Sequence, residues 1–191
     1  LLKIGNLSSI ELCLKNCLSL NRINNVVMAT SNLKEDKILS NYTYDKRVVF
    51  YEGDPNNVIN RYLSIINKLD IDIFLRVTGD MPYISNDIFS YLLESHFRAG
   101  ADYTSANKAA IGTNLEIINS NALKKIKKFF PNGEYSEYMT WYFQNNPKYF
   151  KINLIDLPKK WIRDYRLTLD YDEDLKMLNK IQNHFEKNNL G

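Results

Sequence analysis

Short apolar segments alternate with amphipathic helical patterns along most of the chain, and this alternation constrains the fold more than any other feature of the sequence. Strands joined by crossover helices form a sheet that is buried on both faces, as parallel sheets require. The later segments are richer in strand and less regular, which favours a mixed sheet. We therefore predict an α/β domain with a mixed, mostly parallel sheet flanked by helices. The predicted strands are residues 24–30, 47–53, 72–78, 101–106, 114–118, 148–157 and 165–170.

Capping residues mark the starts of the predicted helices. Ser8 is followed three residues later by Glu11, which is the capping-box pattern of a helix N-terminus. Short polar residues that suit the N-cap position precede three later apolar stripes. These are Asp54, with Pro55 in the first turn, Ser85 and Asp172. The predicted helices are residues 8–20, 32–39, 55–69, 86–98, 119–130, 135–146 and 172–187.

Length and charge limit the classes of function. The 191 residues suit a single domain over 1–191 with a sizeable core. A net charge of +3 is too small to indicate a nucleic-acid partner. No apolar run approaches about 18 residues, so we predict no membrane span. The only cysteines, Cys13 and Cys17, lie four residues apart in an apolar helical pattern, which favours core thiols and a cytoplasmic location.

Two predicted strands end in an aspartate. The segment FLRVTGDMPYIS, residues 74–85, brings Asp80 directly after an apolar run, and RLTLD ends in Asp170. In open α/β sheets, ligands bind at the carboxyl ends of the strands. A carboxylate pair at that rim would suit Mg²⁺, which typically takes one or two carboxylates beside phosphate oxygens. A turn at Asp80 and a helix cap at Asp170 explain the same spacing, so both interpretations stay open.

Arg76 stands inside an apolar strand, where an arginine is normally avoided unless it is paired. We expect it either to pair with an acid at the rim or to reach a substrate anion. Other standard motifs are absent: the sequence contains no P-loop, no GxGxxG fingerprint and no GxSxG elbow. His96 and His184 lack zinc-ligand spacing, and each falls within a helical pattern as a surface or partly buried imidazole.

Five segments in order resemble one protein family. They are NNVVMATS with VVFYEGDPNNVINRY, then FLRVTGDMPYIS, GTNLEIINSNAL, YSEYMTWYF and RDYRLTLDYDEDL. They are similar to motifs of the cytidylyltransferases that activate acidic sugars, in the branch typified by the spore-coat polysaccharide F protein. Each motif is weak alone, but five in the same order form a strong signal. The resemblance implies a Rossmann-like nucleotide-diphospho-sugar transferase fold and transfer of CMP from CTP to an acidic sugar for surface-polysaccharide biosynthesis.

The resemblance also implies roles for individual residues. Asp80 and Asp170 match the family's metal aspartates, and with Arg76 they form the implied catalytic set, with Mg²⁺ as cofactor. In such enzymes a sugar hydroxyl attacks the α-phosphorus in line, aided mainly by positioning and charge neutralisation. Matches around the acceptor pocket are Arg76, Gly112, Glu116, Glu137 and Thr140, and matches beside the nucleotide are Thr30, Ser31, Gly53 and Asp54.

Relatives in this family are commonly homodimers, which makes a homodimer the expected assembly. The aromatic helix around Trp141, Tyr142 and Phe143 is a candidate interface, although core packing is the commoner use of such a stripe.

Three departures from the family pattern stand out. The family's first strand and its basic, glycine-containing loop, which holds the triphosphate, precede the matched region, whereas this chain starts at Leu1. Tyr138 replaces a histidine expected after Glu137, and Asn57 replaces an aspartate. We therefore expect a fragment of a longer enzyme or a degenerate paralogue that binds without turnover. A nucleotide-sugar-dependent glycosyltransferase is a further alternative, because DYD at 170–172 has the spacing of a metal motif.

Overall fold

The computed structural model describes residues 1–132 and 136–189. Its strands are β1 (Lys3–Ile4), β2 (Leu7–Ser8), β3 (Val26–Ser31), β4 (Val48–Gly53), β5 (Ile73–Arg76), β6 (Tyr103–Ala106), β7 (Glu116–Asn119) and β8 (Ile152–Ile155). Its helices are α1 (Ser9–Ser19), α2 (Val58–Leu69), α3 (Asn86–Ala99), α4 (Ser120–Phe129), α5 (Met139–Gln144) and α6 (Asp172–Lys187), with 3₁₀ segments η1 (Lys34–Tyr42), η2 (Ser136–Tyr138) and η3 (Lys159–Trp161). The α/β class is confirmed.

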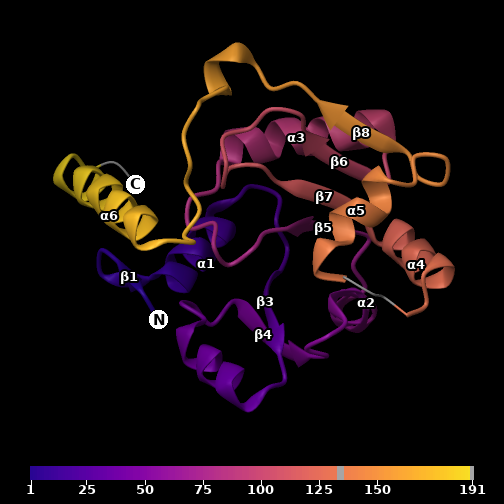
Figure 1. Ribbon diagram of the computed structural model, residues 1–191, viewed down its shortest axis with the longest axis horizontal. Coiled ribbons are helices and arrows are strands. Elements are labelled where there is room, and N and C mark those ends of the chain that lie inside the picture. The colour runs from indigo at the N-terminus through magenta and orange to yellow at the C-terminus, as the bar shows by residue number, and fades with distance from the viewer. Residues whose placement is uncertain (133–135, 190–191) are drawn as a thin grey trace.

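The strands pair in a mixed arrangement (Figure 1). β3 and β4 form a parallel pair, while β5, β7, β6 and β8 follow one another in a four-stranded sheet. Within that sheet β5 and β6 both run antiparallel to β7, and β8 runs parallel to β6. In the described part of the chain, β3 and β5 each have a hydrogen-bonded strand neighbour on one side only. The mixed sheet flanked by helices agrees with the prediction.

Helices cover both faces of these strands. On β7, Ile117 packs against Leu92 of α3 and its neighbours, whereas Ile118 belongs to a cluster with Ile66 of α2 and Leu123 of α4. Successive side chains of a strand point to opposite faces. A strand that is covered on both sides therefore has a continuous apolar sequence, which is why these strands could be predicted. No helix in residues 1–132 or 136–189 is long and apolar enough to cross a bilayer.

The caps at α1 and α3 lie where the sequence predicts them. At α1, the Glu11 N–H donates to Ser8 Oγ at 3.3 Å, and the Ser8 N–H donates to Glu11 Oε2 at 2.8 Å. At α3, the Ile88 N–H donates to Ser85 Oγ. The predicted capping box is confirmed, as is the Ser85 cap.

The predicted cap of α2 is wrong. The N-cap is Asn57, whose side chain accepts from the Asn60 N–H at 2.9 Å. Asp54 Oδ1 instead accepts from the N–H groups of Asn56 and Asn57, at 2.8 and 3.1 Å. Asp54 thus closes the turn that leads into the helix. The helix begins three residues later than the Asp54–Pro55 pair predicted.

The predicted last strand, residues 165–170, is also wrong. Only an isolated bridge between Ile111 and Arg166 forms in this segment. The backbone turns away from the sheet because Asp174 Oδ2 accepts from the N–H groups of Asp170 and Tyr171, each at 3.0 Å. The N-cap position of α6 is accordingly Tyr171 rather than the predicted Asp172.

The remaining differences are local. The structure adds an antiparallel hairpin, β1–β2, that the sequence did not reveal, and it makes the weak helix at residues 32–39 a 3₁₀ segment over Lys34–Tyr42. The aromatic helix is divided into η2 and α5, and its predicted first residue, Tyr135, lies outside the described residues.

The buried imidazole of His96 predicts a pH dependence of stability. The side chain is 2% exposed, and its Nδ1 lies 2.9 Å from Thr104 Oγ1. Burial lowers the pKa of His96, and the charge of Asp102 opposes that effect only in part. The unfolded chain therefore binds this proton more readily than the folded chain. The stability that His96 contributes is complete above about pH 6.5 and declines as the pH falls toward the folded-state pKa.

We expect His96→Gln to flatten the fall in the urea midpoint between about pH 7 and pH 5. His184→Gln is the matched control, because His184 is exposed. Identical pH profiles for the two variants would contradict this assignment.

Candidate functional site

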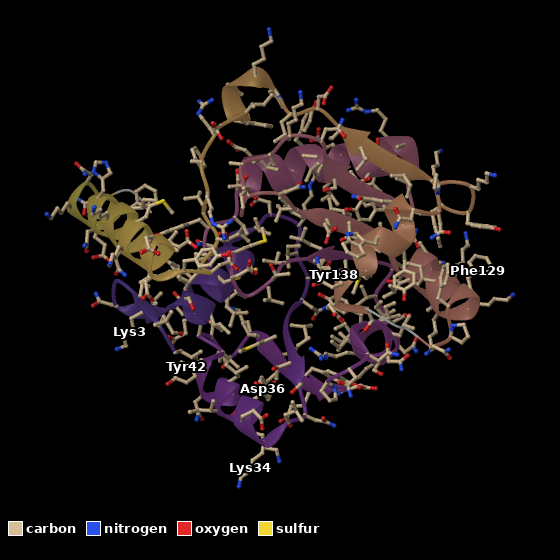
Figure 2. The ribbon with its side chains drawn as sticks, in the orientation of Figure 1. Lys3, Lys34, Asp36, Tyr42, Phe129 and Tyr138 are labelled. Carbon is tan, nitrogen blue, oxygen red and sulfur yellow. The ribbon has the colours of Figure 1, made fainter. Side chains whose placement is uncertain are left out.

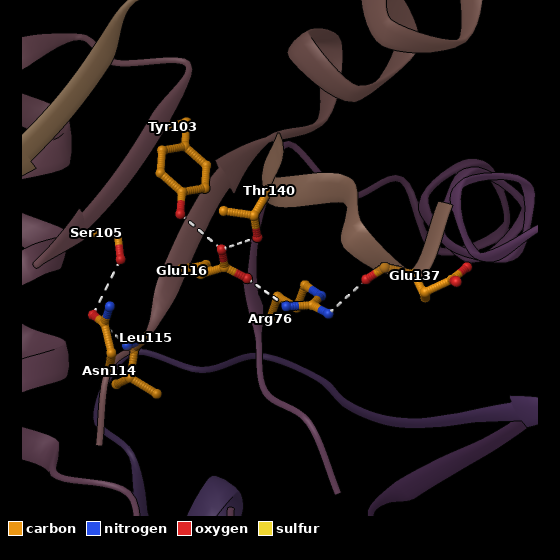
Figure 3. Close-up of polar contacts among 8 residues, drawn as sticks. All are labelled: Arg76, Tyr103, Ser105, Asn114, Leu115, Glu116, Glu137 and Thr140. Carbon is orange, nitrogen blue, oxygen red and sulfur yellow. Dashed lines mark hydrogen bonds and ion pairs between the residues drawn. The ribbon is translucent and has the colours of Figure 1, made fainter. Parts of the chain in front are cut away.

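Glu116 is the centre of a polar cluster between β5, β6, β7 and α5 (Figure 3). The antiparallel register places it directly opposite Arg76, whose Nη1 lies 2.5 Å from Glu116 Oε2. The other carboxylate oxygen accepts from the Tyr103 hydroxyl at 2.7 Å and from the Thr140 hydroxyl. Arg76 Nη2 also donates to the backbone carbonyl of Glu137 at 3.2 Å. Three predicted pocket residues, Arg76, Glu116 and Thr140, are therefore in direct contact.

Burial and neighbouring charges shift the pKa values of Arg76 and Tyr103 in this cluster. The side chains of Arg76 and Glu116 are only 19% and 13% exposed. Burial pulls the pKa of Arg76 down, but the Glu116 charge and nearby phenols outweigh it, so the pKa lies above its ordinary value. Burial and the Glu116 charge raise the pKa of Tyr103, so the phenol keeps its proton and donates it. Arg76 pairs with an acid at the rim, which was one of its two expected roles.

A cavity of about 320 Å³ opens beside the cluster. Its lining contains the Arg76–Glu116 pair and many neutral polar groups, which are Thr78, Tyr103, Ser105, Asn107, Asn114, Thr140 and Gln144. Asn114 is held in place because its Oδ1 accepts from the N–H groups of Ala106 and Leu115, at 3.1 and 3.0 Å. Hydroxyl and amide groups fixed in a concave site of this size suit a small, hydroxyl-rich molecule.

The segments that carry Asp80 and Asp170 lie side by side. The Leu169 N–H donates to the backbone carbonyl of Asp80 at 2.9 Å, and Asp80 itself stands in a turn closed by the Met81 N–H and the Thr78 carbonyl. The carboxylate of Asp170 pairs with Arg166, whose Nε also lies 3.3 Å from Asp174 Oδ1. The two aspartates are thus on adjacent segments, although neither directly ends a strand, because β5 ends at Arg76 and no strand forms at residues 165–170.

The carboxylates of Asp80 and Asp170 meet part of what a Mg²⁺ site requires. Two carboxylates on adjacent segments match the usual protein contribution to a site that phosphate oxygens and water complete. No group of three or more Asp, Glu, His or Cys side chains in the described residues forms a self-sufficient metal site. Arg166 already neutralises Asp170, so an ion there would compete with a guanidinium. The chemistry therefore suits an ion bound together with a phosphate ligand.

Gly112 positions the C-terminal segment and does not line the cavity. Its φ is +86°, and a Cβ there would lie 2.6 Å from the backbone carbon of Leu167. The neighbouring Ile111 carbonyl accepts from the Leu167 N–H at 2.7 Å. Because backbone cannot move as easily as a side-chain end, only glycine allows this approach.

We expect Gly112→Ala to lower the free energy of unfolding by about 1–3 kcal/mol, through the positive φ and the contact with Leu167. Urea unfolding measures the loss. Gly79→Ala is the control, because a Cβ at Gly79 meets only Ile10 Cδ1, at 3.8 Å. Equal losses in both variants would argue against the close approach.

The four residues predicted beside a nucleotide lie together at the carboxyl ends of β3 and β4. Ser31 pairs with Gly53 in the parallel register, with Thr30 and Asp54 as their chain neighbours. The Ser31 hydroxyl donates to Asp36 Oδ2 of η1 at 2.5 Å (Asp36 is labelled in Figure 2). These residues form a rim of their own and do not line the 320 Å³ cavity.

The aromatic segment divides between surface and core. Tyr138 (labelled in Figure 2) and Trp141 stack with ring centroids 4.7 Å apart, and both are about half exposed. Phe143 is buried and stacks on Tyr103, 5.2 Å away. Sequence reasoning missed Tyr103 as a site residue, because nothing in the sequence shows which strands become neighbours. Its place in the predicted strand 101–106 was the only available signal.

Comparisons with known proteins identify the family of this chain. The family model described as "Cytidylyltransferase" matches residues 1–190. The spore coat polysaccharide biosynthesis protein SpsF of Bacillus subtilis is 28% identical over 159 residues, covering 82% of this chain and 66% of that protein. An uncharacterized protein of Methanocaldococcus jannaschii is 27% identical over 191 residues, covering 100% of this chain and 79% of that protein. The chain thus spans slightly less than two thirds of the Bacillus protein.

Two solved structures share the fold. A cytidylyltransferase from Leptospira borgpetersenii superposes with a TM-score of 0.85 at 24% identity, over 96% of this chain and 79% of that one. The CMP:2-keto-3-deoxy-manno-octonic acid synthetase complexed with CTP superposes with a TM-score of 0.65 at 12% identity, over 98% and 91%. Both confirm the Rossmann-like nucleotidyltransferase fold. With a family model that matches almost every residue, the chain belongs to the cytidylyltransferase family.

Proposed function

We propose that this protein transfers CMP from CTP to a hydroxyl of an acidic sugar used in surface-polysaccharide synthesis. The observation that carries the proposal is the 320 Å³ cavity of fixed hydroxyl and amide groups, found in a chain of the cytidylyltransferase family. The names of the Bacillus protein and of the octonic acid synthetase support the acceptor class and the nucleotide.

The residues divide into three roles in this proposal. Asp80 and Asp170 would hold Mg²⁺ at the edge of the site, where the ion would neutralise charge on the triphosphate. Asn114 and Thr140 would orient the acceptor by hydrogen bonds to its hydroxyls. Arg76 would keep Glu116 in position in the wall of the cavity through their ion pair. Thr30, Ser31, Gly53 and Asp54 would lie beside the nucleotide.

Release of pyrophosphate tests the proposal. The protein is incubated with Mg²⁺, with CTP, UTP, ATP or GTP in turn, and with a panel of 3-deoxy-2-ulosonic acids. Release that needs both CTP and an acidic sugar supports it. Transfer from a nucleotide sugar instead would identify a glycosyltransferase. Calorimetric binding of CTP without turnover under any condition would identify a binding protein.

A further inference from the structure

A basic and aromatic patch lies on the outer side of α4 and on the loop before β8. We call it the lysine patch, and it consists of Lys124, Lys125, Lys128, Phe129, Lys148 and Tyr149, all of them exposed. Phe129 (labelled in Figure 2) is 46% exposed, and Tyr149 is 61% exposed. Their ring centroids lie 5.2 Å apart, so this contact joins the helix to the loop.

The opposite side of α4 fixes the helix in the core. Leu123 and Ile126 are fully buried and belong to the cluster that also contains Ile66 of α2. Lys124 and Lys128 are four residues apart, so they lie one above the other on the solvent face of the helix. The apolar face therefore positions the lysines, and the packing of the core does not require their charges.

The positive charge of the patch is not balanced locally. Segments 117–132 and 145–153 contain no aspartate or glutamate. Within residues 1–132 and 136–189, none of the four patch lysines forms an ion pair, whereas three arginines do. The net charge of the chain is +3, so the chain without these four lysines carries −1 (+3 − 4). Charge concentrated on one side orients a molecule toward an anionic surface.

The composition of the patch favours one kind of partner. A two-fold contact with a second copy would bring the same lysines against one another. Arginine is the residue of choice for recognition of nucleic-acid phosphates, and the patch contains none. Phe129 packs against Tyr149 and Phe150, with centroids 5.2 and 6.5 Å away, and is not an isolated ring on which a base could stack. Lysines beside exposed aromatic rings suit the headgroup region of an anionic bilayer.

We propose that the lysine patch binds the protein to the surface of a bilayer that contains anionic phospholipids. The four ammonium groups interact with the headgroup charges, and the rings of Phe129 and Tyr149 enter the interface. No patch residue lines the 320 Å³ cavity, so membrane binding and the candidate site use separate side chains. The proposal concerns the location of the protein and does not depend on the proposed function.

Sedimentation with lipid vesicles tests the proposal. The protein is mixed with vesicles of phosphatidylcholine alone, or of phosphatidylcholine and phosphatidylglycerol at about two to one. We expect binding to the anionic vesicles only, and we expect it to weaken as NaCl rises from about 0.05 to about 0.5 M. The triple variant Lys124→Gln, Lys125→Gln and Lys128→Gln should bind on the order of tenfold more weakly, or less still. Glutamine has nearly the helix propensity of lysine, so the urea midpoint should be kept.

A matched control removes the same charge from another helix. Lys176, Lys180 and Lys187 are exposed on α6, which lies at the opposite end of the molecule from α4 (Figure 1). Changing these three lysines to glutamine should leave vesicle binding nearly unchanged. Tyr149→Ser, which alters the patch without changing its charge, should weaken binding less than the α4 triple variant does.

Three results would overturn the proposal. The first is the absence of binding to anionic vesicles. The second is an equal loss in the α4 and α6 variants, which would reflect net charge alone. The third is binding of a labelled single-stranded RNA that the α4 variant loses, without binding to vesicles, which would identify a nucleic-acid surface.

Discussion

Replacing Glu116 with alanine is expected to lower the free energy of unfolding by about 3–5 kcal/mol. The variant leaves Arg76 charged, mostly buried and without its carboxylate, and it removes the acceptor of the Tyr103 and Thr140 hydroxyls. A buried charge without a partner is far more costly than the pair itself is stabilising. Urea unfolding at neutral pH measures the loss.

An ion pair of the same chemistry on the surface provides the control. Asp45 contacts Arg47 at 2.9 Å, but the arginine side chain is 64% exposed, so Asp45→Ala should lower the free energy of unfolding far less than Glu116→Ala does. The double variant Arg76→Met with Glu116→Leu should recover much of the stability, because it removes both charges together. Equal losses for Glu116→Ala and Asp45→Ala would show that the Glu116 cluster does not stabilise the fold.

Replacing Asp80 or Asp170 with asparagine is expected to lower the rate of CMP transfer by roughly 10²–10³-fold under the proposed function. Each change removes a negative charge where a cation bound with the triphosphate would need it. Steady-state pyrophosphate release with CTP and an active acceptor measures the effect.

Asp87→Asn is the matched control, because Asp87 is exposed in the first turn of α3, a few residues beyond Asp80. The variants must keep the urea midpoint of the unaltered protein, since Asp80 bonds to Leu169 through its backbone and Asp170 pairs with Arg166. Full activity of both Asp80→Asn and Asp170→Asn would show that these aspartates take no part in the reaction.

Periodicity in the sequence revealed the elements that are buried on both faces. β3, β4 and β7 were predicted because side chains on both sides enter the core, as Ile117 and Ile118 show. The segment 165–170 was mistaken for a strand because it alternates polar and apolar residues, yet Asp174 draws its backbone into the turn before α6. The cap of α2 was misplaced since both Asp54 and Asn57 suit that position, and only the geometry of the turn distinguishes them.

The contacts of the polar cluster were predictable only in part, because most of them depend on strand register. Arg76 was recognised because a cation in an apolar strand needs a partner. Its partner Glu116 entered only through the family resemblance, because the β5–β7 register that places them opposite each other is a tertiary property. Tyr103 was missed for the same reason. Gly112 was expected at the acceptor, whereas its visible role is to let Leu167 approach.

The hydrogen bond between the Leu169 N–H and the Asp80 carbonyl has a consequence for synthesis on the ribosome. Domains emerge from the N-terminus, so Asp80 leaves the ribosome long before its neighbour does. The segments that carry the two aspartates become adjacent only after Leu169 has also been released. A nascent chain that stops before Leu169 would therefore lack this contact, and synthesis of the segment before α6 would set the moment at which the two aspartates come onto adjacent segments.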